Sequence, residues 1–441
     1  MRVLVIDQDR CGLDFAMRAA AAGHEVRWFA WTKKPSKIGQ GIKGIQMVDD
    51  WRTHMPWAKD GLIFMTANNR YLTEIDRYRA DFGYKVFGPT AASARLEIDR
   101  KAGMEAFRSI GVELPPYQEV NSYEEAETLA RKSDKVFVFK PTGDSDDKAS
   151  TYASSSPADM VGWLQRRIAA GKKLTAPAVM QEKIDRLAEI GVSGWMGPEG
   201  FLPDRWSFCW EHKPLYPGDI GQNTGEQGSV LQYLESDKLA DDMLKPLEPV
   251  LRALGHSGDF AVGAMLDTKG RAWPLEFTAR CGYPAWWIQS ASHRGDPVQW
   301  MYDLVRGRDS LKVSYDAAIG VVVSQPQYPN DTAPADMVEG IPIQGADDVL
   351  DDIHLVEAMR GRGPVMDGGK VVERPVFETA GEYVLVATGL GKTVTQAQKR
   401  VYGTIDKVKF PQKGYRNDIG DKVKAQLAAV QRAGYALDME P

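Results

Sequence analysis

The chain has 441 residues, of which 43% are hydrophobic and 26% are charged. At about 100 to 200 residues per domain, this length predicts two to four packed units. The composition is that of a globular protein and excludes a disordered chain. Fifty-five Lys and Arg residues against 60 Asp and Glu residues give a formal charge of -5. We therefore expect no nucleic-acid partner and no anionic membrane surface as a partner.

The sequence carries no sign of export or membrane insertion. The start, MRVLVID, lacks the basic region and long apolar run of a signal peptide. No stretch approaches the ~18 uninterrupted apolar residues of a membrane span. Cys11, Cys209 and Cys281 are too widely separated for a zinc motif or a disulfide framework. A cytoplasmic protein, either a monomer or a homodimer, is the expectation.

Apolar runs and helical segments alternate at the amino terminus. Val3–Ile6 predicts a buried strand, Leu13–Ala22 a helix, and Glu25–Ala30 a second strand. Gly61–Thr66 and Lys85–Gly88 repeat the strand signal at intervals long enough for crossover helices. This alternation predicts a parallel, doubly wound α/β sheet over about the first hundred residues.

The sequence in the middle of the chain indicates two strands with a lid-like loop between them. A helical stretch begins at Arg100, and the strand VFVFK ends at Lys140. A second strand, AVMQEKI, spans Ala178–Ile184. Between the strands lies GDSDDKASTYASSS, which is polar and rich in small residues, as expected of a mobile loop.

A hairpin and two helices are predicted further along. Asp259–Leu266 and Ala272–Thr278 read as strands joined by DTKG, with Gly270 at the turn. The segment from Gly381 to Lys409 predicts a strand followed by a helix, and Lys422–Arg432 a short amphipathic helix.

Several residues could bind a phosphate, a carboxylate or a metal. Lys140 ends a strand, where ligands of α/β proteins often bind, although a strand-capping lysine is the alternative. Glu276 lies among strand residues, where an acid needs a cation or a metal as partner. Arg280, two residues after Thr278, could face a phosphate or carboxylate, or form an ordinary ion pair. Lys101 alone reads as a solvated charge.

The segment GDIGQNTGEQG, at 218–228, holds four glycines and the Asn223-Thr224 pair. This composition lets backbone amides approach an oxyanion, and a surface turn is the alternative interpretation.

Taken in order, these segments resemble the phosphoribosylamine-glycine ligase (glycinamide ribonucleotide synthetase) family of the ATP-grasp superfamily. The resemblance runs from about residue 85 to 420. It is carried by the following segments: GPTAASARLEIDRKAGMEAF, VFVFKP, VMQEKI, GDIGQNTGEQGSV, AVGAMLDTKGRAWPLEFTARCGYP, LGKTVTQAQKRVYGTIDKVKF and YRNDIG.

The resemblance implies a multidomain α/β and α+β protein with the ATP-grasp fold. We expect an amino-terminal α/β (preATP-grasp) domain over 1–100, an ATP-grasp domain over 101–312 with a mobile lid at about 118–182, and a carboxyl-terminal α/β domain over 313–441. It also implies a reaction, in which ATP phosphorylates a carboxylate, classically that of glycine, and an amine then attacks the acyl phosphate to give an amide.

The resemblance also implies roles for single residues. Lys101, Lys140 and, in the lid, Lys148 would face the nucleotide phosphates. Glu182 would lie on the strand that frames the adenine, and Glu189 would meet the ribose hydroxyls. Glu276 and Thr278 would hold Mg²⁺ or Mn²⁺, and Arg280, Asn223 and Thr224 would hold the reacting carboxylate and acyl phosphate.

The sequence departs from the family pattern at four places. Thr278 replaces a metal-binding Asn, and the lid carries Asp144, Asp146 and Asp147, with only Gly143 and Lys148 suited to covering phosphates. The amino-terminal phosphate loop is replaced by DQDRCG, which brings Asp7 and Asp9. Tyr283 and Ala285 replace two acids after the arginine.

These departures leave two functional hypotheses. The first is an ATP-dependent carboxylate-amine ligase that uses an amino acid, with glycine as the first candidate, and whose acceptor amine need not be phosphoribosylamine. An authentic glycinamide ribonucleotide synthetase is its close variant. The alternative is a catalytically degenerate nucleotide-binding module.

Overall fold

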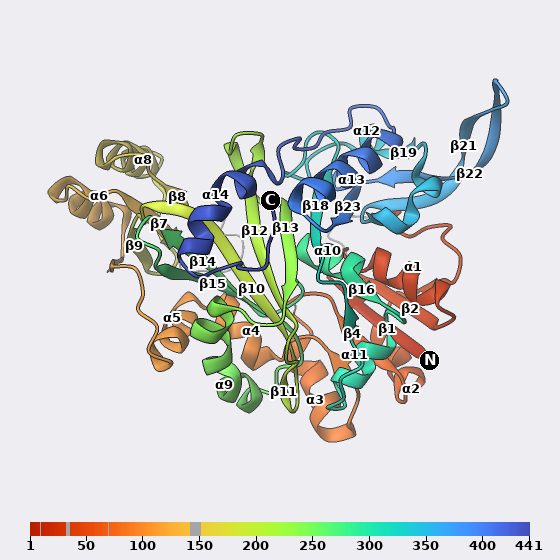
Figure 1. The fold of residues 1–441 in the computed structure, drawn as a ribbon, viewed down its shortest axis with the longest axis horizontal. Helices are drawn as coiled ribbons and strands as arrows, with labels where there is room; N and C mark the ends of the chain where they lie inside the picture. Colours follow the sequence, from red (N-terminus) through yellow and green to blue (C-terminus); the bar gives the residue numbers. More distant parts are fainter. Residues whose placement is uncertain (9, 32–35, 69, 142–150) are drawn as a thin grey trace.

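The computed structural model describes residues 1–441 except 9, 32–35, 69 and 142–150 (Figure 1). Its first unit is a five-stranded parallel sheet, as the alternation of strands and helices predicts. The strands, in spatial order, are β3 (Ile45–Met47), β2 (Glu25–Ala30), β1 (Arg2–Asp7), β4 (Leu62–Met65) and β5 (Val86–Phe87). Its helices are α1 (Leu13–Ala21), α2 (Met55–Ala58) and α3 (Leu72–Phe82), with a 3-10 turn at Trp51–His54.

Central strand β1 is buried on both faces, which explains its uninterrupted apolar sequence. Val3 and Val5 pack in one hydrophobic cluster with Phe15 of α1. Leu4 and Ile6 point to the opposite face and pack with Trp51.

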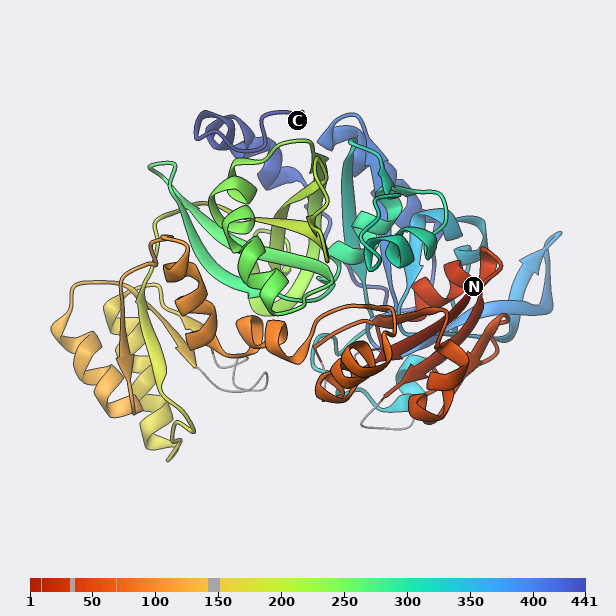
Figure 2. The same cartoon turned by 90° about the horizontal axis from the view of Figure 1, so that it is seen from below.

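A four-stranded antiparallel sheet forms the opposite end of the molecule (Figure 2). Its spatial order is β6 (Tyr117–Val120), β9 (Ala178–Glu182), β7 (Phe137–Pro141) and β8 (Tyr152–Ala153). Helices α6 (Tyr123–Lys132) and α8 (Pro157–Ala169) pack on it through a separate small core that contains Phe139 and Trp163. Helices α4 (Ala91–Ile98) and α5 (Arg100–Ser109) connect this unit to the first sheet.

A nine-stranded sheet lies between these units and contains the predicted hairpin. Its path is β15 (Ala272–Thr278), β14 (Gly258–Asp267), β10 (Arg186–Gly197), β12 (Trp206–Tyr216), β13 (Ile220–Leu234), β18 (Ala317–Val323), β23 (Leu385–Gly391) and β20 (Ile353–Leu355), with β11 (Gly200–Phe201) beside β10. Gly228 of β13 pairs with Val321 of β18, so strands from both sides of the predicted boundary at residue 313 belong to one sheet. The bounds of the three domains stay predictions.

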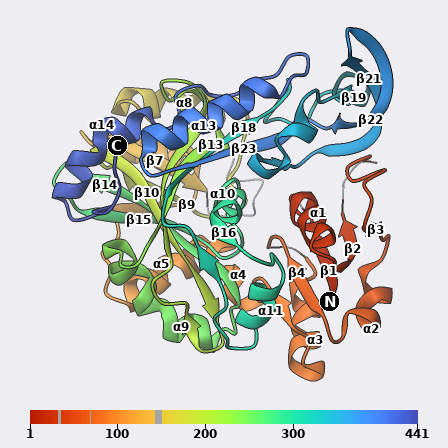
Figure 3. The same ribbon diagram turned by 45° about the vertical axis from the view of Figure 1, so that its right-hand side comes forward.

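The remaining elements pack around this sheet. They are α9 (Glu248–Ala253), α10 (Ala285–Ser292), α11 (Gln299–Leu304), α12 (Ala335–Val338), α13 (Val394–Lys407), α14 (Asp421–Arg432) and the pair β16 (His293–Arg294) and β17 (Lys312–Val313). Strands β21 (Ala358–Asp367) and β22 (Lys370–Ala380) form a long hairpin that projects from the body, and β19 (Glu339–Pro342) pairs with β22 at its base (Figure 3). The predicted helices at Leu13–Ala22 and Lys422–Arg432 are thus confirmed within two residues at each end.

The glycine-rich segment at 218–228 is mostly strand rather than loop, because β13 already begins at Ile220. Its first turn is held by the carboxyl-terminal YRNDIG segment. Buried Arg416 lies 2.9 Å from Asp219 and 2.7 Å from Asp418, whose carboxylate accepts a hydrogen bond from the Gly218 amide. None of the described helices has the length and apolar character that crossing a bilayer requires.

Candidate active site

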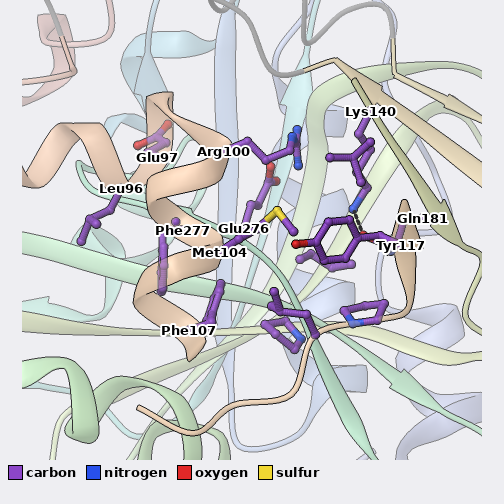
Figure 4. A pocket seen from close by; sticks show the side chains of 16 residues that line it. Leu96, Glu97, Arg100, Met104, Phe107, Tyr117, Lys140, Gln181, Glu276 and Phe277 are labelled. Atoms are coloured by element: carbon purple, nitrogen blue, oxygen red, sulfur yellow. Dashed lines mark hydrogen bonds between the residues drawn. The ribbon is translucent and has the colours of Figure 1, made fainter. Parts of the chain in front are cut away.

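Lys140 lies at the end of β7 and points into a pocket between α5, β9 and β15 (Figure 4). Its ammonium is buried and donates a 2.8 Å hydrogen bond to Oε1 of Gln181 on the neighbouring strand. Burial lowers the pKa of Lys140 to about 7, and the Arg100 guanidinium adds to this effect while Glu276 opposes it. A nearby anion would stabilise the charged form of this buried ammonium.

The two basic residues at the start of α5 differ in their surroundings. Arg100 lines the same pocket, and its Nε donates to the carbonyl of Pro141 at 3.2 Å. Lys101 is exposed, and among the described residues the pocket lining includes Arg100 but not Lys101. Both depend on the cap of α5, where the Asp99 carboxylate accepts hydrogen bonds from the amides of Lys101 and Ala102.

Glu276 on β15 lines this pocket and also a second hollow beside it. Its strand is fixed by two contacts. Phe277 stacks on Phe107 of α5 with ring centroids 4.0 Å apart, and Glu276 pairs with Gly263 of β14. The alternating side chains of a strand place Phe277 in the core and Glu276, 48% exposed, toward the cleft.

Lys213 on β12 connects three carboxylates at the edge of the second hollow. Its ammonium lies 3.0 Å from Glu189, 3.0 Å from Glu211 and 3.5 Å from Glu276. Burial alone would lower the pKa of Lys213, but the three carboxylates raise it well above its usual value. Glu189 and Glu276, predicted from separate strands, therefore come together around one cation.

The second hollow has a volume of about 150 Å³ and lies over one face of the nine-stranded sheet. Its floor is made of small residues, which leave space above the strands. Thr278 and Arg280 line it at the end of β15. The residues of the floor are Gly191, Ser193, Ser207, Cys209, Ala261 and Gly263.

Arg280 is held by Glu97 of α4, which lines the first pocket. Nη2 of Arg280 lies 3.2 Å from Oε1 of Glu97, and Nη1 donates to the Cys281 carbonyl at 2.9 Å. Oε2 of Glu97 accepts hydrogen bonds from the Ala279 amide and from Asn68. Arg280 therefore stands between the two cavities.

Asn223 and Thr224 lie on β13, near Lys213 rather than in the deep part of the hollow. Asn223 is exposed and pairs with Pro214, and Oγ1 of Thr224 donates to the Lys213 carbonyl at 2.8 Å. The next residues, Gly225 and Glu226, line the hollow.

Glu182, at the end of β9, faces another side of its strand. Its carboxylate lies 3.9 Å from Lys135, and it lines a surface pocket with Met180 and Phe137. The predicted lid residue Lys148, together with Gly143, Asp144, Asp146 and Asp147, lies outside the described residues.

The turn after β1 is occupied by a carboxylate of the chain itself. Buried Asp7 accepts hydrogen bonds from the amides of Gly12 at 2.7 Å and Cys11 at 3.2 Å. It also accepts from Trp28 Nε1 at 3.1 Å and Thr66 Oγ1 at 2.9 Å. The amides before α1 that could receive a phosphate therefore already have an anionic partner. Asp9 lies outside the described residues.

Among the site residues that the sequence patterns do not single out are Arg100, Gln181, Glu211 and Lys213. Lys213 and Glu211 alternate along β12 in the run WEHKPLY, a period-two pattern that places both on one face. Arg100 is next to Lys101 in the sequence. The rotation of helix α5 about its axis decides which of the two side chains faces the pocket.

A divalent metal suits the donors present, although the part of the chain that the structure describes contains no cluster of three His, Cys, Asp or Glu arranged to hold one. Glu276 offers a carboxylate and Thr278, two residues along the same strand, offers a hydroxyl. Hard cations such as Mg²⁺ take few protein oxygens when phosphates supply the rest.

Comparison with known proteins shows which enzymes the chain is similar to. The family model for the phosphoribosylglycinamide synthetase C domain matches residues 318–422. A phosphoribosylamine-glycine ligase from Halalkalibacterium halodurans is 26% identical over 433 residues, covering 92% of this chain and 96% of the relative. One from Ralstonia nicotianae is 26% identical over 359 residues, covering 79% of this chain and 81% of the relative.

The fold agrees with this similarity. A crystal structure of phosphoribosylamine-glycine ligase from Thermotoga maritima matches with a TM-score of 0.68 and 22% identity, covering 95% of this chain and 100% of that chain. The chain is thus similar to phosphoribosylamine-glycine ligases over most of its length and has the ATP-grasp fold.

Proposed function

We propose that the protein is an ATP-dependent ligase that activates the carboxylate of an amino acid, with glycine as the first candidate, and joins it to an amine. The observation that carries this proposal is the position of Glu276, which lines both the pocket of Lys140 and the hollow of Arg280. A phosphate bound on one side of Glu276 would thus meet a carboxylate bound on the other.

The nucleotide phosphates would bind to the cations of the first pocket. Lys140 and Arg100 provide two cationic groups within one cavity, and phosphoryl transfer depends on such positioning and charge neutralisation. Lys101 and Lys148 remain predicted phosphate contacts. Glu182 remains the predicted residue of the adenine-framing strand, and Glu189 the predicted partner of the ribose.

Glu276 and Thr278 would hold Mg²⁺ or Mn²⁺, whose chemistry is to bridge phosphate oxygens and neutralise their charge. Lys213, between Glu189, Glu211 and Glu276, orients these carboxylates and limits their mutual repulsion.

Arg280 would orient the substrate carboxylate, assisted at the outer end by Asn223 and Thr224. A carboxylate oxygen attacks the γ-phosphorus of ATP, ADP leaves, and an acyl phosphate forms. The acceptor nitrogen then attacks the acyl carbon, phosphate leaves with its oxygen, and the nitrogen loses a proton. Arg280 stays in place through both steps because Glu97 holds it.

The acceptor is proposed to be an amine other than phosphoribosylamine. The Asp7 carboxylate accepts hydrogen bonds from the amides of Cys11 and Gly12 at the start of α1. The Asp7 carboxylate would therefore repel a second anion at this place. The protein is further proposed to act in the cytoplasm, as a monomer or homodimer, on small molecules and without a nucleic-acid partner.

The test is ADP release with ATP, Mg²⁺, glycine and a panel of amines, with and without phosphoribosylamine. The proposal predicts release that requires both the amino acid and one amine. Tight ATP binding without turnover for any amino acid or amine would contradict it.

One observation favours the alternative, a nucleotide-binding module without catalysis. The ammonium of Lys213 lies 3.5 Å from Glu276, so the predicted metal ligand already has a cationic neighbour. Glu276→Gln separates the two functions, because it would abolish ligase turnover and leave nucleotide binding by a module unchanged.

A further inference from the structure

The deep end of the second hollow contains a cluster that the proposed phosphoryl chemistry does not use. Asp259 on β14 and Gln289 on α10 both line the hollow and are 3% and 1% exposed. Nε2 of Gln289 donates to Oγ of Ser193 at 2.9 Å and to Oγ of Ser207 at 3.2 Å. The Ser193 hydroxyl and the Gly282 amide in turn donate to Asp259. These contacts fix the orientation of both side chains.

Two acceptor atoms of this cluster have no hydrogen-bond partner. They are Oδ1 of Asp259 and Oε1 of Gln289, both fully buried. Buried polar atoms in folded proteins are nearly always hydrogen-bonded, so two such acceptors in one cavity indicate a ligand that donates. An ammonium group suits this pair, because it offers three donors and a positive charge to the carboxylate.

The strand register places this cluster at a useful distance from the proposed reaction centre. Ala261 of β14 pairs with Thr278, and Asp259 lies two residues before Ala261 on the same face. At ~3.4 Å per residue, Asp259 is therefore about 7 Å along the strand from the level of Thr278. A compact substrate can extend from Thr278 and Arg280 to Asp259.

We propose that Asp259 and Gln289 bind the α-ammonium group of the amino acid whose carboxylate is activated beside Arg280. This inference rests on the proposed ligase function and assigns its amino-acid specificity to two residues. The cavity, at about 150 Å³, suits a ligand about the size of benzene. A small α-amino acid such as glycine meets this limit, and its two charged ends match Arg280 and Asp259.

Ammonium binding would also prevent one amino-acid molecule from acting as the acceptor of another. A free α-amino group could attack an acyl phosphate, whereas a protonated one has no lone pair for attack. A carboxylate stabilises the protonated form, so Asp259 would leave the acceptor amine as the nucleophile.

The experiment measures ligand binding to the full-length protein with Mg²⁺ and a non-hydrolysable ATP analogue. Equilibrium dialysis compares the twenty common α-amino acids, acetate, which lacks the amine, and trimethylglycine, which keeps the charge without N–H donors. The variants are Asp259→Asn and Gln289→Leu. The matched control is Asp237→Asn, another buried acid with an unpartnered oxygen, which accepts from the Ala240 amide outside the hollow.

We expect one small amino acid to bind at least about tenfold tighter than acetate or trimethylglycine, as one charged hydrogen bond would give. Asp259→Asn and Gln289→Leu should each remove about tenfold of that preference, whereas acetate and nucleotide affinities stay unchanged. Asp237→Asn should bind like the wild type.

Equal affinities for the amino acid and acetate, or an unchanged preference in Asp259→Asn with intact nucleotide binding, would overturn the inference. Failure of all twenty amino acids to bind would overturn it as well. Amino-acid binding without turnover for any amine would instead contradict the ligase proposal and leave the ammonium site standing. A wild-type protein that does not bind the nucleotide analogue would contradict the ligase proposal but not the ammonium site.

Discussion

Glu97 and Arg280 form an ion pair, with 3.2 Å between Oε1 and Nη2, across the boundary of the two cavities of the site. The carboxylate comes from α4 and the guanidinium from the segment after β15, so the pair joins two elements that are 183 residues apart. The Glu97 carboxylate also accepts a 2.8 Å hydrogen bond from the Ala279 amide. The position of Arg280 therefore depends on a residue to which the proposed reaction assigns no substrate contact.

Glu97→Gln should raise the KM for the amino acid about tenfold, because the charged partner that orients Arg280 is lost. The affinity for nucleotide should change little, which separates this effect from a general disturbance of the site. Initial-rate kinetics of ADP release measure both. Glu74→Gln, which removes the partner of Arg52 on the surface, is the control and should behave as the wild type. Equal KM values in Glu97→Gln and wild type would show that Arg280 needs no such support.

Arg100→Met should weaken nucleotide binding at least about tenfold, because it removes a cation from the pocket of Lys140. Lys101→Met should have a much smaller effect, since that side chain is exposed. Titration with a fluorescent ATP analogue measures both variants. The reverse order would support the prediction made from the sequence, in which Lys101 contacts the phosphates.

These two residues illustrate how far the sequence predicts the site. The run VFVFK predicted a buried strand that ends in a lysine, and Lys140 is indeed buried at the end of β7. The choice between Arg100 and Lys101 depends on the phase of a helix packed through Phe107 on Phe277. No local pattern carries that information, because it comes from a contact between distant segments.

The nine-stranded sheet shows the same distinction. The hairpin of β14 and β15 was predicted from its turn, since Gly270 has a φ of 84° that favours glycine. The cluster of Glu189, Glu211 and Glu276 around Lys213 requires strands β10, β12 and β15 in one sheet order. Helix α10 packs mainly against β13, β18 and β23. The Gln289 side chain reaches from this helix to Ser193 of β10 and Ser207 of β12, which brings it into the hollow of Asp259. Their hydrogen bonds through Ser193 and Ser207 have no sequence signature.

Asp259→Asn should change how stability depends on pH in the ligand-free protein. Burial raises the pKa of Asp259 to about 7, against the opposing hydrogen bonds from Ser193 and Gly282 and the charge of Arg280. Cys209, Tyr233 and Cys281 are the other titratable groups that face it. The native state holds this proton more tightly than the unfolded state, so its contribution is full below the unfolded pKa and is lost as pH rises to about 7.

The variant should therefore gain stability relative to the wild type between pH 4 and pH 8, by on the order of 4 kcal/mol. Urea unfolding at several pH values measures this difference, and Asp242→Asn, at an exposed acid, is the control. A difference between wild type and Asp259→Asn that does not vary with pH would contradict the buried, ionisable state of Asp259.

Asp7→Ala should destabilise the amino-terminal unit by about 2 to 4 kcal/mol, because buried donors on Gly12, Trp28 and Thr66 lose their acceptor. Asp7→Asn should cost less, since the amide oxygen still accepts. Hydrogen exchange at the amides of β1 and α1, followed by mass spectrometry, reports on the stability of this unit. If both variants are as stable as the wild type, the network around Asp7 does not hold the turn in place.

The same turn predicts the kind of acceptor. Ribose 5-phosphate should not inhibit the wild-type enzyme, because the amides of Cys11 and Gly12 already donate hydrogen bonds to the Asp7 carboxylate. Competition assays against the acceptor amine that supports ADP release measure this. Strong competitive inhibition would place a phosphate site elsewhere in the amino-terminal unit.

The central claim is that a carboxylate is phosphorylated between Lys140 and Arg280, and positional isotope exchange tests it without knowledge of the acceptor. ATP is labelled with heavy oxygen at the bridge between its β- and γ-phosphorus atoms and incubated with the protein, Mg²⁺ and the amino acid. Reversible formation of the acyl phosphate lets the β-phosphate of bound ADP rotate, so the label should move to non-bridging positions. The account predicts exchange that requires the amino acid and disappears in Glu276→Gln. Label that stays in the bridge, while ATP and the amino acid are both bound, would contradict it.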